Sequence, residues 1–432
     1  MAISYRVLLV SVLALMGCSM QAAAWRVPLD ILPTPQQSTI FYASDSLNIY
    51  VTNARGVLFA VRAIDGAVQW STAIGGTGSQ VNPKVFPEFP GYVFTETNGY
   101  GCQIISTSSG TVDASIPNCT YIRPAGSAGL LVAKAYSVSL MTTAGTTLWS
   151  YSIDESFGNL GHIAASSSVC AVVVHPASNF FVAQLLTFST DSGVMLCNIT
   201  KEVNLQPFVS IPFEVVAGNF LISGHGTSDV FTPYVFDLIT CRVFNTKYVP
   251  TTFSFQGTYI TLLNAKGSLY YTNVTEVTPQ GDWNVTVTKN IVGSDVAVWQ
   301  KKLQTPAGGA LAPVTPVVGN TAFQPDAIII SYGGGYIGAF NDTTGEEMWT
   351  ITQRVPFGPS NNNQQFVYPM GSGKLFIPNL QGYIVIDVRT GTIVERNEMT
   401  PILAAVSFLT TAGTPGVVYI DGATGDVVGK NF

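Results

Sequence analysis

Few residues of this chain have the types and spacing that catalysis or metal binding requires. Asp154, Glu155, Asp295 and Asp326 are acidic residues that could ligate calcium or act as a general base. Each also fits a simpler interpretation as a solvated residue in a loop. We therefore assign no catalytic, cofactor-binding or metal-binding residue from the sequence.

Histidine and cysteine chemistry finds no better support. The chain has three histidines, His162, His175 and His225, and the cysteine spacing contains no CxxC pair and matches no zinc signature. His225 lies between two glycines, but no Gly-x-Ser-x-Gly elbow accompanies it, so a serine hydrolase is not indicated. A turn residue is the better interpretation of His225.

The cysteines instead predict a disulfide. Cys102 and Cys119 are close in sequence and flank one turn, and an oxidising compartment would pair them, although two small buried thiols are the alternative. Three further cysteines follow the export segment described below, and the resulting odd total leaves one unpaired. They are Cys170, Cys197 and Cys241.

Five Asn-x-Thr sequons are candidate glycosylation sites if the source is eukaryotic: Asn118, Asn198, Asn273, Asn284 and Asn341. Chance alone would give about four in a chain of this composition, so their number says little about the host. Asn273 and Asn284 lie in a polar stretch and are the best of the five.

The elements that would position these residues are given by a sequence repeat. Each repeat has an apolar strand, a polar turn with Gly, and a Trp four residues after the Gly. Weaker copies replace the Trp or the Gly, and the turns recur about 34 to 48 residues apart, apart from one gap of 104 residues. Clear and weak copies together comprise Asp65, Gly66, Trp70, Gly110, Gly145, Trp149, Gly193, Cys241, Trp299, Asp342, Gly345, Trp349, Asp387, Gly391 and Gly425.

One copy of the repeat predicts a β-hairpin. The Asp or Thr side chain caps backbone amides of the turn, and Gly adopts the positive φ that a Cβ would resist. The flanking segments, such as 382–388 and 416–421, are rich in β-branched and aromatic residues, which favours strands. We expect each Trp to pack against the neighbouring repeat.

This pattern resembles the repeat of the pyrroloquinoline-quinone-type propellers, the quinoprotein alcohol dehydrogenase-like superfamily, with its small-x-Asp-x-x-Thr-Gly-x-x-x-Trp core. The resemblance covers about residues 40–432 and implies an all-β propeller of four-stranded blades. Eight blades fit the turns best, with seven as the alternative, if the hairpin near Gly425 closes the ring with a strand around residues 40–52. Trp25 then lies outside the repeat.

The resemblance implies the scaffold rather than the chemistry. Quinone-dependent members of the superfamily cover the cofactor with a disulfide between adjacent cysteines, beside Ca²⁺, and this chain has no adjacent cysteine pair. A non-catalytic platform for a protein or small ligand at the propeller face is therefore favoured, without a cofactor. Alternatives are a quinone- and calcium-dependent oxidoreductase, and a propeller lipoprotein of outer-membrane assembly.

The first residues predict export. Arg6 precedes an apolar run at 7–16, and small residues follow at 22–24, so we expect a cleavable signal at 1–24 and one propeller domain at 25–432. The run is too short to span a membrane. The alternative to a secreted protein is a lipid anchor on Cys18, within Leu15-Met16-Gly17-Cys18.

The composition argues against a nucleic-acid partner. The chain is 47% hydrophobic and 10% charged, with a net charge of −6. No basic stripe is present, which argues against nucleic-acid binding.

Overall fold

The fold is known from a computed structural model of the chain. The structure describes residues 24–29, 42–45, 47–53, 55–75, 81–97, 101–156, 159–175, 182–202, 215–216, 220–226, 231–245, 259–263, 268–277, 283–291, 294, 296–305, 315–318, 327–332, 336–352, 368–370, 373–379, 382–398, 402–409, 415–421 and 424–431. Of these, 24, 42, 44 and several other strand positions are described by their backbone alone. No helix within these ranges is long and apolar enough to cross a membrane.

The strands of the first half form four sheets in chain order, each with four antiparallel strands. These are β2 (Tyr42–Ser44), β3 (Asn48–Thr52), β4 (Val57–Arg62) and β5 (Val68–Ala73); β6 (Val81–Lys84), β7 (Tyr92–Thr97), β8 (Gly101–Ser106) and β9 (Val112–Ile116); β10 (Cys119–Pro124), β11 (Leu130–Lys134), β12 (Ser137–Met141) and β13 (Thr147–Ser152); β14 (Asn159–Ala165), β15 (Val169–His175), β16 (Val182–Ser189) and β17 (Met195–Glu202).

The second half continues the same plan with four more sheets. These are β18 (Val215–Val216), β19 (Phe220–Gly226), β20 (Phe231–Asp237) and β21 (Val243–Asn245); β22 (Tyr259–Leu263), β23 (Ser268–Val277), β24 (Trp283–Ile291) and β25 (Trp299–Thr305); β26 (Thr315–Val318), β27 (Ala327–Tyr332), β28 (Tyr336–Asn341) and β29 (Glu347–Thr352); β30 (Tyr368–Met370), β31 (Lys374–Asn379), β32 (Gly382–Asp387) and β33 (Ile393–Glu398).

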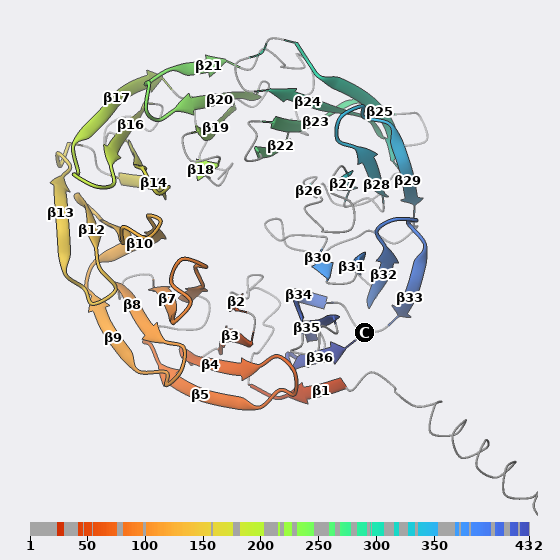
Figure 1. Cartoon of the computed structure of the whole chain (residues 1–432), viewed down its shortest axis with the longest axis horizontal. Helices are drawn as coiled ribbons and strands as arrows, with labels where there is room; N and C mark the ends of the chain where they lie inside the picture. Colours follow the sequence, from red (N-terminus) through yellow and green to blue (C-terminus); the bar gives the residue numbers. More distant parts are fainter. Residues whose placement is uncertain are drawn as a thin grey trace, which may run out of the picture.

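A ninth sheet joins the two ends of the described residues. It has the order β1 (Ala24–Val27), β36 (Val427–Asn431), β35 (Pro415–Asp421) and β34 (Ile402–Leu409). The sheets follow one another around a ring (Figure 1). In the first eight sheets the first strand lies nearest the axis and the fourth at the rim; in the ninth, β34 lies nearest the axis and β1 at the rim. The predicted all-β propeller of four-stranded blades is therefore confirmed.

The blade count was wrong: the described strands form nine four-stranded sheets rather than eight. Gly391 lies in a turn between the third and fourth strands of its sheet, whereas the turn with Gly425 joins β35 to β36, the second and third strands. That turn therefore comes one strand early in its sheet and is not an equivalent copy of the turn with Gly391.

The strand that closes the ring was also misplaced. β1, at 24–27, supplies the rim strand of the ninth sheet, and Trp25 pairs with Gly429 of β36. The segment expected to close the ring, 40–52, contains β2 and β3, which are inner strands of the next sheet. No local signal marks Trp25 as a repeat residue, because Gln21 rather than Gly stands four residues before it.

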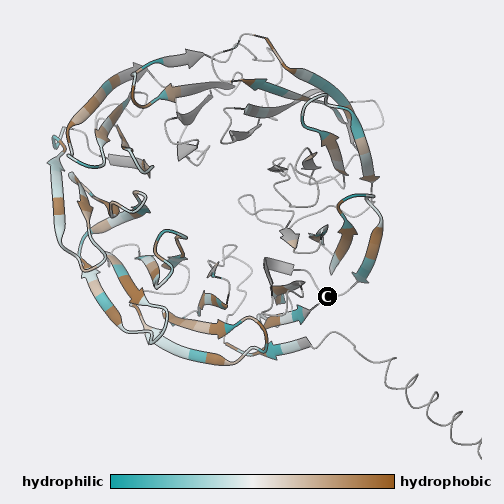
Figure 2. Cartoon of the chain, in the orientation of Figure 1, coloured by the Kyte–Doolittle hydropathy of each residue, from teal (hydrophilic) through white to brown (hydrophobic). Residues whose placement is uncertain are grey.

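Apolar side chains fill the spaces between neighbouring sheets, and apolar residues are interspersed with polar ones along the strands (Figure 2). Between the third and fourth sheets, for example, Leu131 and Val138 belong to one buried cluster with Val172 and Phe188. Burial on both faces explains why second and third strands such as β11 and β32 are almost entirely apolar.

Candidate functional site

The repeated Trp is a docking residue between neighbouring sheets. At five junctions its indole ring packs on the turn Gly of the next sheet, where an added Cβ would lie 2.5 to 2.7 Å from a ring atom. The five glycines have φ between +68° and +74°, so both the space and the backbone require glycine. The pairs are Trp25 with Gly66, Trp70 with Gly110, Trp149 with Gly193, Trp299 with Gly345, and Trp349 with Gly391.

A hydrogen bond fixes each of these contacts. The indole N–H donates to the carbonyl oxygen of the residue three positions before the Gly, at distances of 2.7 to 3.1 Å. The acceptors are Ala63, Thr107, Thr190, Asp342 and Val388. Trp25 makes the same contact as the others, so its assignment outside the repeat was wrong.

A disulfide replaces this contact at one junction. Cys197 occupies the Trp position of β17, Cys241 occupies the Gly position of the next sheet, and the two are joined. Cys241 keeps the left-handed backbone of the glycines, with φ of 60°, and Cys197 Sγ lies 3.3 Å from the carbonyl oxygen of Leu238, three residues before Cys241. The disulfide is thus a covalent version of the Trp and Gly contact.

We predict that the pair can be exchanged for the non-covalent contact. The double variant Cys197→Trp/Cys241→Gly should keep the free energy of unfolding within about 1 kcal/mol of the natural protein, because it rebuilds the contact of the other junctions. Cys197→Ala/Cys241→Ala, the matched control, should lose about 2–5 kcal/mol. Urea unfolding followed by tryptophan fluorescence measures both. Equal losses in the two variants would contradict the equivalence.

The weaker copies vary the contact further. Gly145, with φ of +82°, faces the smaller Ala114, whose Cβ would lie 3.5 Å from an added Cβ. Glu395 holds the Trp position of β33, and its carboxylate accepts hydrogen bonds from Tyr383 Oη, at 2.9 Å, and from Lys430 Nζ. Lys430 belongs to β36 of the ninth sheet, so an ion pair between Glu395 and Lys430 connects the two sheets at this junction.

The Asp residues of the turns have different roles. Asp65 and Asp387 accept backbone N–H bonds within their turns, as expected of caps. In the turn before Gly345 that role falls to Asn341, while the Asp342 carboxylate binds Lys289 Nζ at 2.9 Å and the hydroxyl of Tyr270. Asp342 therefore ties two sheets together.

The structure joins Cys102 of β8 to Cys119 of β10, the pair expected from the sequence. The Cys197–Cys241 pair was not foreseen. Cys170 is a buried free thiol, and burial raises its pKa to about 12, which suits a core residue rather than a nucleophile.

The sequon residues occupy unlike places. Asn118 and Asn198 are exposed, Asn284 and Asn341 are half-buried, and the side chain of Asn273 lies outside the described residues. Asn118 has φ of 59° and precedes the disulfide-bonded Cys119.

The acidic and histidine candidates do not come together. Asp154 is exposed, and the backbone N–H of Ser156 lowers the pKa of its carboxyl, which is the behaviour of a turn cap. Glu155 is exposed beside it. Asp295, Asp326 and the three histidine side chains lie outside the described residues, and within those residues no group of three His, Cys, Asp or Glu side chains could hold a metal.

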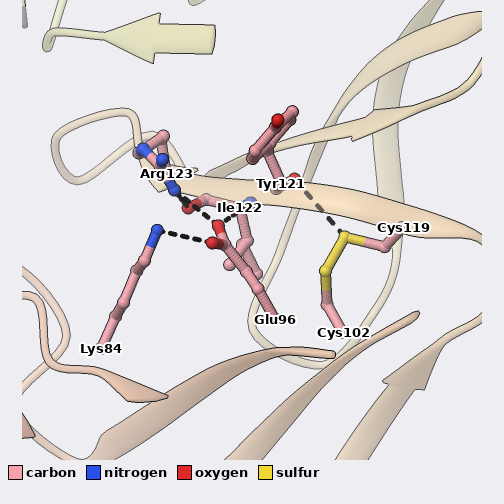
Figure 3. Close-up of a disulfide and its surroundings, with 7 residues drawn as sticks. All are labelled: Lys84, Glu96, Cys102, Cys119, Tyr121, Ile122 and Arg123. Carbon is pink, nitrogen blue, oxygen red and sulfur yellow. Dashed lines mark hydrogen bonds and ion pairs between the residues drawn. A yellow bond between two sulfur atoms is a disulfide. The ribbon is translucent and has the colours of Figure 1, made fainter. Parts of the chain in front are cut away.

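The most unusual charged group is a cluster on the inner strands that the sequence did not indicate. Glu96 of β7 lies between Lys84 of β6 and Arg123 of β10, beside the Cys102–Cys119 disulfide (Figure 3). Its Oε2 accepts from Lys84 Nζ at 2.6 Å, and its Oε1 accepts from Arg123 Nη1 at 2.5 Å. We call these three residues the Glu96 cluster.

The cluster also satisfies a strand edge. The N–H of Ile122, on the innermost strand of its sheet, donates to Glu96 Oε1 at 2.8 Å, and the Ile122 carbonyl accepts from Arg123 Nη1 at 2.6 Å. Side chains therefore take the place of a neighbouring strand on β10. No local signal marks this arrangement, because its members come from three strands of two sheets.

Two cations share one carboxylate in this cluster. Burial lowers the pKa of the Lys84 ammonium; the Glu96 carboxylate opposes that effect, and the charge of Arg123 adds to it. The side chain of Glu96 is 10% exposed, that of Lys84 18% and that of Arg123 28%. The three charged side chains together carry one net positive charge, and all three are only partly exposed to water.

No protein-family model matches the chain, and no curated protein matches it. Solved structures do resemble it in fold. BamB from Moraxella catarrhalis is 12% identical, with a TM-score of 0.45, over 96% of this chain and 99% of that one. The computationally designed Ika8 protein is 11% identical, with a TM-score of 0.50, over 92% and 97%. Saccharomyces cerevisiae Sqt1 is 9% identical, with a TM-score of 0.49, over 96% and 100%.

Proposed function

We propose that the protein is an exported propeller that serves as a scaffold for protein interaction. The observation that carries this proposal is an exposed apolar loop between β24 and β25, defined by Ile291, Val296 and Val298. Their exposed fractions are 49%, 72% and 44%, and Val296 is the most exposed large apolar residue among those the structure describes.

The loop departs from the repeat in a way that presents these side chains. The Val298 N–H donates to the Lys289 carbonyl across this loop, a longer connection than the turn of the next sheet, where the Asn341 N–H donates to the Glu346 carbonyl. Within the loop, the Ser294 N–H donates to the Ile291 carbonyl, and the Ser294 hydroxyl donates to the Val296 carbonyl. Trp299, directly after the loop, is anchored on Gly345 of the next sheet. A loop whose described residues expose apolar side chains to water is typical of a protein-contact surface.

Cross-linking from the loop tests this function. A photo-activatable phenylalanine analogue at Val296, in cells that express the full-length protein, should yield a discrete cross-linked protein. The yield should fall when Val298→Asp is added, because a charge opposes apolar contact. The same analogue at exposed Gln69, on another rim strand, is the matched control. Equal diffuse background at both positions would overturn the proposal.

Titration with pyrroloquinoline quinone, with and without Ca²⁺, separates the scaffold from the oxidoreductase alternative. A scaffold should show no stoichiometric binding by calorimetry and no chromophore as isolated. Calcium-dependent binding at one equivalent would replace the scaffold proposal with the redox one and direct mutagenesis to the acidic residues of the inner strands.

Export is part of the proposal, and the two disulfides support an extracytoplasmic location. N-terminal analysis of the protein from its source separates the two forms of export. A mature protein that starts at Trp25 would establish cleavage of 1–24, and a lipid-modified Cys18 would establish the anchored alternative.

A further inference from the structure

From the Glu96 cluster we infer a binding site for a carboxylate ligand, held by Arg123 and Lys84 at the axial edge of β6 and β10. The site goes beyond the proposed function, which concerns a loop at the rim. The first support is charge: Lys84 and Arg123 carry two positive charges, Glu96 carries one negative charge, and both Glu96 oxygens are already engaged.

The second support is unused donors. Both hydrogen bonds of the Arg123 guanidinium, to Glu96 Oε1 and to the Ile122 carbonyl, come from Nη1. Arg carries five N–H donors, so its Nε and Nη2 edge has no acceptor among the described residues. That edge has the fork geometry that binds a carboxylate through two parallel hydrogen bonds.

The third support is position. β10 lies on the axis side of the ring (Figure 1), and β6 is the first strand of the adjacent sheet, opposite its rim strand β9. Arg123 remains 28% exposed and Lys84 18%, so both side chains are accessible to a ligand in solution. The Arg123 guanidinium also lies over the Tyr121 ring, 5.8 Å from its centroid, which holds the group in place.

The net charge of the Glu96 cluster determines which anion it prefers. One net positive charge matches a monoanionic carboxylate better than a dianionic phosphate, since a second negative charge would face Glu96 without a partner. Glu96 already lies between the ammonium and the guanidinium, so the ligand meets the remaining Nε and Nη2 edge of Arg123. An acidic side chain, the C-terminus of a polypeptide and a free organic acid share this chemistry.

The experiment follows the Arg123 Nε–H resonance in two-dimensional NMR while sodium acetate replaces sodium chloride at constant ionic strength. We expect a saturable shift with a dissociation constant on the order of millimolar. Arg26 is the internal control, because it already pairs with two carboxylates, Asp421 at 3.0 Å and Asp426 at 3.1 Å. Its resonance should not saturate. The Arg123→Lys variant assigns the Arg123 signal by its disappearance.

Variants then test the two cations. Lys84→Gln keeps a polar group at a half-buried position and should weaken acetate binding about tenfold, the effect of one charge-assisted hydrogen bond. Glu96→Gln raises the net positive charge and should strengthen binding. A linear shift, an equal response to chloride, or unchanged affinity in Lys84→Gln with native circular dichroism would overturn the site.

Two peptides with acetylated N-termini identify the source of the carboxylate. The first carries an internal Glu and a C-terminal amide. The second carries Gln in place of that Glu and has a free C-terminus. Saturation by the first assigns an acidic side chain, saturation by the second assigns a peptide terminus, and saturation by acetate alone assigns a small organic acid. Phosphate that binds more tightly than acetate would refute the carboxylate assignment.

Discussion

Trp25→Ala should lower the free energy of unfolding by about 3 kcal/mol, the lower end of the range for a large aromatic side chain, because Trp25 is partly buried. Trp25 packs on Gly66 of the hairpin turn that it meets across the junction and faces Gly429 of its own sheet, where an added Cβ would lie 2.0 Å from the ring. Its indole N–H also donates to the Ala63 carbonyl at 3.1 Å. The variant empties the junction at which the ring closes.

Two comparisons make this result decisive. Trp349→Ala removes an equivalent contact at an internal junction, with Trp349 8% exposed, and should cost a similar amount. Tyr136→Ala removes an aromatic ring that is 45% exposed and should cost less than about 0.5 kcal/mol. A Trp25→Ala loss no larger than that of Tyr136→Ala, by urea unfolding, would mean that the ring closes without its docking residue.

Gly345→Val should cost about 4 kcal/mol or more, for two reasons that add. The φ of +70° is strained for a β-branched residue, and the new Cβ would lie 2.7 Å from Trp299 Cδ2. The matched control is Gly91→Val, because no heavy atom lies within 4 Å of an added Cβ at Gly91 and its φ is not in the left-handed region. That change should cost less than about 0.5 kcal/mol.

A double variant separates the two causes in Gly345→Val. In the Trp299→Ala background the clash with the indole is gone, so the substitution should cost only the backbone strain, about 1–3 kcal/mol. Thermal or urea unfolding of the natural protein, the two single variants and the double variant completes the cycle. Strict additivity of the two changes would show that Gly345 and Trp299 do not act as a pair.

The features that could be predicted are those formed by residues close together in the sequence. A turn with Gly and a Trp four residues later occupy one hairpin, so Gly66 with Trp70 and Gly345 with Trp349 could be recognised within a dozen residues. Repetition of that hairpin was enough for the propeller. The pairing of Cys102 with Cys119 was also within reach, because 17 positions separate them.

The rest depends on contacts between sheets, which local spacing does not encode. Each Trp docks on the next hairpin rather than its own, so Cys197 and Cys241 are separated by 44 positions although they replace one such contact. Glu96 gathers its partners from 12 residues before it and 27 after it. Trp25 has its strand partner, Gly429, at the opposite end of the sequence.

The four-residue strand β1 has a consequence for biosynthesis. Its partner in the closing sheet, residues 427–430, is separated from it by about 400 residues, as is Asp426 from Arg26. A ribosome makes that partner about 400 residues after β1, so β1 must wait unpaired until the other sheets of the ring have been made. During that interval both edges of the open ring are available to chaperones or to other polypeptides.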